Sequence, residues 1–379
     1  MNGKKITLIA SASMGIEGIV KDECKNLGFE NVNTHNGRVE FDGTLVDIPK
    51  ANINLRCADR VYLKMGQFKA RSFEELFQEV LSIPWEDIIP IDGEFPISWV
   101  SAVNCKLFSK SDIQKIAKKA IVERLKKKYR QIVFKENGAK YAIKIQGLKD
   151  EFLIMIDTSG EALHKRGYRY LHNEAPIKET MAAAMVYLSH WKGGELPMLD
   201  PMCGTGTIPI EAAMIARNIA PGVNRNFAAE AWDIIPLDVW LEARDDAMSK
   251  ENYEKTVKVY GSDIDEASIK IAQKNAEKAG VEDDIIFEVK NVLTLEPEEK
   301  KGAIITNPPY GDRLMTEEAV QRLYTLLGDI YRMRFNRWSM YIITSYEEFQ
   351  EYFGKKATKN RKLYNGGLKC YFYQYHGER

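Results

Sequence analysis

The sequence contains few cysteines and none of the paired spacings that cysteine sites use. Five cysteines are scattered over 379 residues, and no two of them form a Cys-x-x-Cys pair. This scatter argues against a zinc site and against a disulfide framework, and it is typical of proteins in a reducing compartment. We therefore expect no metal centre and a cytoplasmic location.

Long apolar runs and an excess of charge of either sign are also missing. No stretch approaches the roughly 18 apolar residues that cross a membrane, and the first residues lead into about five apolar ones, too few for a signal peptide. Lysines plus arginines number 54, and so do aspartates plus glutamates. We expect a globular protein of two or three domains, whose total charge does not indicate a polyanionic partner.

The first 158 residues predict two small α+β units. Strand and helix signals alternate over residues 5–68, with a hairpin turn at Asn36-Gly37, and predict a ferredoxin-like domain over residues 1–65. Residues 66–158 form the second unit, with a long helix expected at 109–129.

Positive charge is concentrated in this second unit. Between Ser101 and Asp150 there are twelve lysines and two arginines against four acids. A lysine-rich helix is often only a solvated surface, but so large an excess in a neutral chain favours a footprint for a phosphate backbone. Lysine suits positioning on a backbone better than reading bases. The expected contacts are Lys118, Lys119, Lys126 and Lys127.

Strands and helices alternate through residues 159–379, which we take as the third domain. This pattern predicts a doubly wound, mostly parallel sheet that binds ligands at the carboxyl ends of its strands. Residues 221–250, with Trp232 and Trp240, interrupt the alternation and are expected to be a helical insertion. Asn365-Gly366-Gly367 predicts a closing hairpin.

A glycine loop follows the strand that ends at Asp200. Its residues are Cys203, Gly204, Thr205, Gly206 and Thr207. The glycines let backbone approach a ligand where a Cβ would clash, although the loop matches neither the P-loop nor Gly-x-Gly-x-x-Gly. The Asp200 carboxylate could orient a ligand's ammonium group, directly or through water. Cys203 has no basic neighbour, so we expect a small buried side chain and not a nucleophile.

Two later strands also end in polar residues. Asp263 follows the next strand, where an acid commonly binds a ribose diol. Asp265 is more simply the N-cap of a helix. Asn291-Val292 follows the third strand, where a side chain and a backbone amide can meet an adenine, although a plain exposed asparagine competes with that interpretation.

The stretch Asn307-Pro308-Pro309-Tyr310-Gly311 follows a further apolar strand. Prolines fix φ and remove backbone donors, so the carbonyls there stay free to accept hydrogen bonds. The Asn307 amide oxygen is an acceptor, and Tyr310 can stack on a flat ring. These parts suit gripping the amino group of a planar base. A proline-rich turn would compete in isolation, but the upstream loop and Asp263 favour a site beside a cofactor.

Together, Asp-Pro-x-Cys-Gly-Thr-Gly-Thr, Gly-Ser-Asp-Ile-Asp and Asn-Pro-Pro-Tyr-Gly resemble the class I S-adenosylmethionine-dependent methyltransferases that methylate amino groups. The flanks 163–169 and 175–180 resemble the THUMP-containing RNA guanine-N2 methyltransferases, which include 23S rRNA and tRNA enzymes. The resemblance covers essentially the whole chain. It implies a Rossmann-like methyltransferase sheet preceded by ferredoxin-like and THUMP units that bind RNA. No second methyltransferase unit follows, so we expect no dual-activity fusion.

The resemblance implies S-adenosylmethionine as cofactor and a guanine N2 amine in structured RNA, most simply 23S rRNA, as substrate. Catalysis would fall to Asn307, Pro308 and Tyr310. Cofactor binding would fall to Asp200, Cys203, Gly204, Thr205, Gly206, Thr207, Asp263, Asn291 and Asn307, although related enzymes often carry aspartate in place of Asn291. Arg166 and Arg169 join the four lysines as expected RNA contacts.

Four alternatives stay open at this point. The first is a tRNA guanine-N2 methyltransferase. DNA adenine-N6 or cytosine-N4 methylation uses the same kind of amino-group site, but no base-reading module is evident. Protein glutamine methylation is disfavoured by the basic unit, and an inactive RNA-binding scaffold is disfavoured by the intact glycine loop and Asn-Pro-Pro-Tyr.

Overall fold

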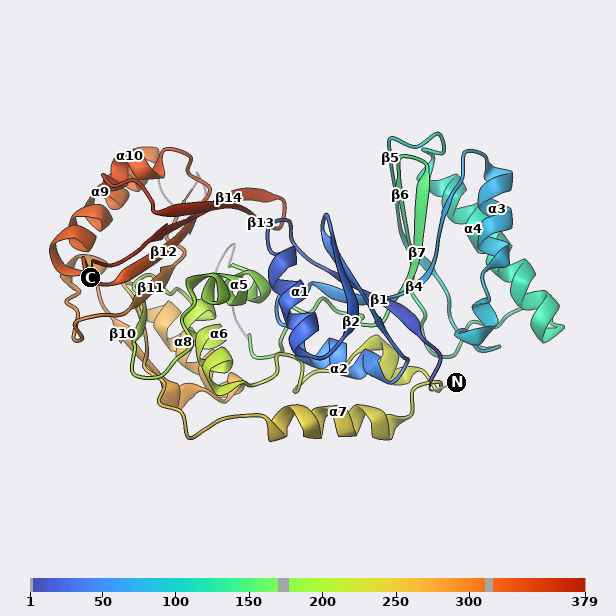
Figure 1. The fold of residues 1–379 in the computed structure, drawn as a ribbon, viewed down its shortest axis with the longest axis horizontal. Coiled ribbons are helices and arrows are strands. Elements are labelled where there is room, and N and C mark those ends of the chain that lie inside the picture. The colour runs from blue at the N-terminus through green and yellow to red at the C-terminus, as the bar shows by residue number, and fades with distance from the viewer. Residues whose placement is uncertain (1–2, 170–176, 311–315, 379) are drawn as a thin grey trace.

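The computed structural model describes residues 3–169, 177–310 and 316–378, which form two lobes (Figure 1). Gly311, and residues 175 and 176 of the second flank, lie outside the described residues. No described helix is long and apolar enough to span a lipid bilayer.

The N-terminal lobe is built on one continuous seven-stranded sheet in the order β2-β3-β1-β4-β7-β6-β5. Its strands are β1 (Ile6–Ser11), β2 (Glu30–His35), β3 (Arg38–Gly43), β4 (Arg60–Lys69), β5 (Ile97–Val103), β6 (Ile143–Leu148) and β7 (Glu151–Asp157). Its helices are α1 (Glu17–Asn26), α2 (Asp47–Asn54), α3 (Phe73–Ser82), η1 (Trp85–Asp87) and α4 (Lys110–Tyr129). The two predicted units therefore share a sheet, and the expected boundary between residues 65 and 66 falls inside β4, beside its bulge.

One face of this sheet carries the core of the lobe. Leu8 of β1 is paired with Leu63 of β4, and Leu63 is paired with Ile156 of β7, so the three side chains share a face. All three are buried in the main hydrophobic cluster, together with apolar residues of α1 to α4. The four helices therefore cover this face, and no helix of the described residues 3–158 packs on the opposite face.

The C-terminal lobe is a second seven-stranded sheet in the order β10-β9-β8-β11-β12-β14-β13. Its strands are β8 (Met198–Asp200), β9 (Val259–Asp263), β10 (Ile285–Val289), β11 (Ala303–Thr306), β12 (Ser339–Thr344), β13 (Lys359–Asn365) and β14 (Leu368–Tyr375). Its helices are α5 (Glu179–Ser189), α6 (Thr207–Arg217), η2 (Ala228–Ala231), α7 (Leu237–Ser249), α8 (Glu266–Ala279), η3 (Glu282–Asp284), η4 (Val292–Thr294), α9 (Glu317–Arg334) and α10 (Phe349–Phe353). Only β14 runs antiparallel to its neighbours β12 and β13, so the doubly wound, mostly parallel sheet is confirmed.

The insertion at residues 221–250 belongs to the C-terminal lobe and packs against the N-terminal lobe. It contains η2 and α7, and α7 runs beneath α2 of the N-terminal lobe (Figure 1). Trp232 is buried, stacks on Tyr141 with ring centroids 4.7 Å apart, and donates its Nε1–H to the Lys140 carbonyl. The predicted helical insertion is thus present, and its tryptophans serve contacts between elements.

Candidate active site at the carboxyl ends of the parallel strands

The glycine loop, Asp263 and Asn307 lie together because their strands are neighbours. The order β9-β8-β11 places the residues after each strand along one edge of the parallel sheet. Gly204 N donates to Asp263 Oδ2 over 2.9 Å, joining the loop directly to the end of β9. The structure thus brings together the residues that the sequence predicts in one site.

The two glycines of the loop do different things. Gly204 has φ +53°, and a Cβ built there would meet nothing within 4 Å, so the space beside it is open to a ligand. Gly206 has φ +83°, and its Cβ would lie 2.9 Å from Ala272 Cβ and 3.0 Å from the Phe287 ring. The expectation that both glycines admit a ligand therefore fits Gly204, whereas Gly206 lets α6 pack against α8.

Asp200 ties β8 to the residue that precedes Asn307. Its Oδ1 accepts hydrogen bonds from Thr306 Oγ1 at 2.7 Å and from Met202 N at 3.2 Å. The side chain is 1% exposed, and burial raises its pKa to about 7, with the nearby Asp263 charge acting in the same direction. A direct contact with a ligand's ammonium group does not fit this position, and the water-mediated contact stays a prediction.

Cys203 and Asp265 occupy the structural positions that the sequence predicted. Cys203 is buried, and desolvation raises the pKa of its thiol well above the usual range, which does not suit a nucleophile. Asp265 is the N-cap of α8, where its carboxylate accepts from Ala267 N and Ser268 N. Asn291 is exposed, and its Oδ1 accepts from Leu293 N to cap η4.

Asn307 presents a free acceptor at the end of β11. Its Oδ1 is buried and has no hydrogen-bond partner among the described residues. Tyr324 of α9 fixes the following backbone, because its hydroxyl donates to the Pro309 carbonyl over 3.2 Å. Tyr310 is partly buried against the core, and its hydroxyl lies beside Asn365 and Cys370 of the β13–β14 hairpin. Residues 307–310 are therefore fixed by α9 and by the β13–β14 hairpin, and the Asn307 amide oxygen remains able to accept a hydrogen bond.

Sequence reasoning missed the residues that hold this segment. Thr306 could have been suspected as the one polar residue of an apolar strand, immediately before Asn307. Tyr324 gives no local signal, because it lies in a helix fifteen residues beyond Pro309.

The predicted arginine contacts with RNA do not fit the structure. Arg166 is 4% exposed, lies 3.3 Å from the buried Glu211 of α6, and donates to the carbonyls of Leu163 and Arg56. Arg169 is paired with Glu179 at 3.2 Å and donates to Thr207 Oγ1 at 2.7 Å. Both guanidinium groups join the segment before α5 to α6, the helix that follows the glycine loop.

The predicted lysine contacts divide into two pairs. Lys118 bonds to Glu136 at 2.8 Å and lies 3.4 Å from the Phe95 ring centroid, and Lys126 pairs with Glu123 at 2.9 Å. Lys119 and Lys127 are exposed and form no ion pair with any described residue. The latter two are the ones available to a phosphate backbone.

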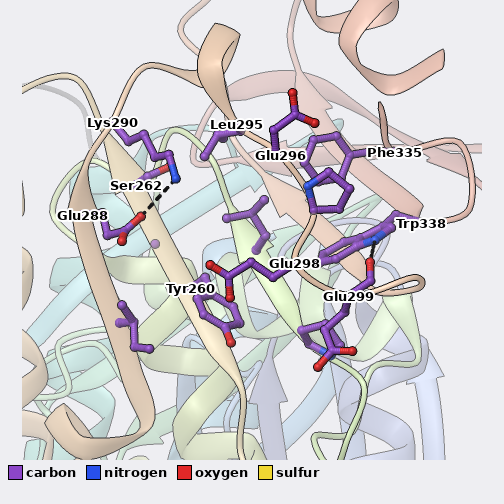
Figure 2. A pocket seen from close by; sticks show the side chains of 15 residues that line it. Tyr260, Ser262, Glu288, Lys290, Leu295, Glu296, Glu298, Glu299, Phe335 and Trp338 are labelled. Carbon is purple, nitrogen blue, oxygen red and sulfur yellow. Dashed lines mark hydrogen bonds and ion pairs between the residues drawn. The ribbon is translucent and has the colours of Figure 1, made fainter. Parts of the chain in front are cut away.

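A pocket is lined by residues of β9 and β10, by the segment 295–299, and by Phe335 and Trp338 after α9 (Figure 2). Its cavity volume is about 50 Å³, and Tyr260, Ser262 and Glu288 of β9 and β10 are among the residues that line it. Four glutamates and one lysine line it: Glu288, Glu296, Glu298, Glu299 and Lys290. This acidic lining disfavours a polyanion, so we assign no RNA contact to the pocket.

The chemistry of the strand-end residues fits S-adenosylmethionine. The space beside Gly204 is open to a ligand. The half-buried Asp263 carboxylate accepts hydrogen bonds from two backbone amides and keeps further lone pairs that can accept from ribose hydroxyls. With this sheet order, the site defines a class I S-adenosylmethionine-dependent methyltransferase.

Comparison with known families gives the same class and a narrower group. Residues 166–374 match the RMKL-like methyltransferase domain, residues 7–62 the RlmL ferredoxin-like domain, and residues 70–157 the THUMP domain. The chain belongs to this RMKL-like methyltransferase family.

Similar proteins carry several names. The chain is 46% identical to YpsC of Bacillus subtilis (strain 168), named as a candidate RNA methyltransferase, over 98% of this chain and 96% of that protein. It is 37% identical to the ribosomal RNA large subunit methyltransferase K/L of Psychromonas ingrahamii, over 95% of this chain but only 49% of that protein. The chain thus spans about half the length of the K/L relative.

The solved structures that resemble the whole chain include the following two. SMU.472, a candidate methyltransferase in complex with SAH, matches with TM-score 0.92 and 42% identity over 99% of both chains. A structure described as a predicted N6-adenine-specific DNA methylase from Listeria monocytogenes matches with TM-score 0.93 and 47% identity, over 99% of this chain and 97% of that one.

Proposed function

We propose that this protein transfers a methyl group from S-adenosylmethionine to the exocyclic N2 amine of a guanine in structured RNA, with rRNA favoured over tRNA. The observation that carries the proposal is the buried Asn307 Oδ1 at the end of β11, which has no hydrogen-bond partner in the part of the chain that the structure describes. An unsatisfied buried acceptor costs about 1–3 kcal/mol, which a ligand N–H can offset. An amino group on a planar base is the complementary donor.

The chain's own residues would act mainly by orientation. A guanine amino nitrogen is a poor nucleophile, because its lone pair is delocalised into the ring. With its two N–H groups donating hydrogen bonds to Asn307 Oδ1 and the Pro308 carbonyl, the nitrogen would become more pyramidal and more reactive. The partly exposed Tyr310 ring would stack on the base. Alignment and electrostatic preorganisation would then supply the rate enhancement.

The cofactor would be held by the residues of the strand ends. Gly204, Asp263 and Asn291 present backbone, carboxylate and amide groups along one edge of the sheet. When bound there, S-adenosylmethionine supplies an electrophilic methyl group. A guanine inside a helix would have to leave the stack first, at a cost of a few kcal/mol.

The choice of RNA rests on the N-terminal lobe and on the names of relatives. A THUMP unit with a local excess of lysine suits a phosphate backbone, and two relatives, YpsC and the K/L protein, are named for RNA. DNA adenine-N6 methylation is the second candidate, because one solved relative is described that way and the Asn307 acceptor suits any planar amino group.

A substrate panel tests the proposal. Labelled S-adenosylmethionine is offered with deproteinised rRNA, tRNA and duplex DNA, and the modified nucleoside is identified after digestion. We expect N2-methylguanine in rRNA. N2-methylguanine in tRNA alone would keep the proposed reaction and change the proposed RNA from rRNA to tRNA. N6-methyladenine in DNA as sole product would overturn the proposal.

A further inference from the structure

Among the described residues, no helix of the N-terminal lobe covers the second face of its sheet, and that face exposes an aromatic ring. Trp99, Ser101 and Val103 alternate along β5 and pair with Lys144, Gln146 and Leu148 of the parallel strand β6. Paired residues share a face. The neighbouring Ile143 and Ile145 point the other way, into the core beneath the helices.

Trp99 is unlike the other tryptophans of the chain. It is 47% exposed, whereas the remaining five are at most 3% exposed. Val103 and Leu148, at the ends of the two paired strands, are 53% and 47% exposed. A separate small cluster of Ile9, Tyr62, Leu153 and Met155 lies on the same sheet, and Lys144 Nζ donates to Tyr62 OH beside it. The face thus combines polar side chains with exposed apolar ones, of which Trp99 is the largest.

Lysines without ion pairs surround the end of this face. Lys69, Lys106, Lys110 and Lys149 are exposed, and none forms an ion pair with a described residue. Two acids lie nearby, but Asp150 is bound to Arg71 and to the Lys106 amide, and Glu151 is bound to Gln67. Phe108, in the loop between Lys106 and Lys110, is 79% exposed. Aromatic faces combined with lysines match the chemistry of unpaired nucleotides.

The position of the face also suits a substrate that must reach the active site. Strands β5, β6 and β7 stand between the helices α3 and α4 and the C-terminal lobe (Figure 1). The helix-free face therefore looks toward the catalytic lobe, whereas α4 covers the side turned away from it.

We propose that this face, centred on Trp99, stacks an unpaired base of the RNA substrate while the four lysines hold its backbone. Unpaired nucleotides are specified because a duplex does not offer the flat side of a base for stacking. The inference rests on the proposed function for the identity of the partner as RNA.

Fluorescence of the full-length protein tests the proposal, because Trp99 is the one tryptophan open to a collisional quencher. A short oligoadenylate should quench Trp99 emission and shield it from acrylamide. Trp99→Ala should weaken binding of labelled oligoadenylate by about 5- to 100-fold. It should raise the KM for RNA and leave kcat unchanged. Trp99→Phe should keep the affinity and lose the fluorescence change.

Ile132→Ala is the matched control, because Ile132 is 83% exposed in the loop beyond α4, and it should alter nothing. Two results together would overturn the proposed stacking on Trp99 while leaving RNA methylation intact. They are an unchanged RNA affinity and KM in Trp99→Ala, and no change of Trp99 emission when the wild-type protein binds RNA. Duplex RNA that shields Trp99 as well as oligoadenylate does would also overturn it. Wild-type protein that methylates no RNA would instead count against the proposed function.

Discussion

At the scale of single residues, a position can bind a ligand only if there is open space beside it. The carbonyls and amides of the glycine loop are set by two positive φ values, but only Gly204 has free volume beside it. The sequence predicted the loop correctly and could not distinguish its glycines. The contact that explains Gly206 involves Ala272 and Phe287, more than sixty residues away.

Two alanine variants separate these roles. Gly206→Ala places a methyl group 2.9 Å from Ala272 Cβ, so we expect about 1–3 kcal/mol lower unfolding free energy, measured by urea titration. Gly204→Ala should cost about 1–2 kcal/mol of backbone strain and, in addition, weaken S-adenosylmethionine binding in calorimetry. Unchanged cofactor affinity in folded Gly204→Ala would contradict the assignment of the open space to the ligand.

Asp200 should make stability depend on pH. Its pKa is raised to about 7 in the folded state from an ordinary value near 3.9, so the folded state holds a proton that the unfolded state has lost. Stability from this group is full below about pH 4 and declines as the pH rises toward 7. Unfolding free energies of wild type and Asp200→Asn should therefore diverge across that range, with wild type losing more. A constant difference would rule this out.

At the scale of elements, buried charge joins the segment before α5 to the helix that follows the glycine loop. Glu211 of α6 is fully buried, and it meets Arg166 and the hydroxyl of Tyr168. The polar stretch around Arg166 looks exposed in sequence, because its partner lies 45 residues further on. Strand and helix positions, the Asn36-Gly37 hairpin and the Asp265 N-cap were predictable, since each depends on local pattern.

Removing two neighbouring cations of this segment should change the unfolding free energy by very different amounts. Arg166→Ala leaves Glu211 without its closest cation inside the protein, and we expect a loss of about 3–5 kcal/mol of unfolding free energy. Lys165→Ala removes only an exposed pair with Glu161, so the change should stay within about 0.5 kcal/mol. Chemical denaturation of both variants measures this. Equal stability of the two would show that Arg166 is not buried as described.

At the scale of the whole molecule, charge is sorted between surfaces although the total is zero. Of the predicted cations, Lys119 and Lys127 on α4 remain available to RNA, whereas Arg166 and Arg169 hold the fold together. Composition gives the excess of lysine in the second unit. It does not tell which cations remain unpaired at the surface, because folding brings carboxylates close to some of them and forms ion pairs there.

Replacing both Lys119 and Lys127 by glutamine should weaken RNA binding and lower its salt dependence. Each lost phosphate contact reduces the slope of log affinity against log salt by about 0.7 for a single strand. Fluorescence polarisation with labelled rRNA fragments over a salt series gives both values. Lys126→Gln is the control, because Lys126 is engaged by Glu123. An unchanged slope in the double variant would remove α4 from the RNA-binding surface.

We propose that Asn307 Oδ1 accepts a hydrogen bond from the target amine during methyl transfer. The most direct test is single-turnover methylation of RNA by Asn307→Ala, with S-adenosylmethionine affinity measured on the same sample. We expect a loss of at least about 100-fold in the rate of methyl transfer with nearly unchanged cofactor affinity. Methyl transfer at the wild-type rate by this variant would contradict it.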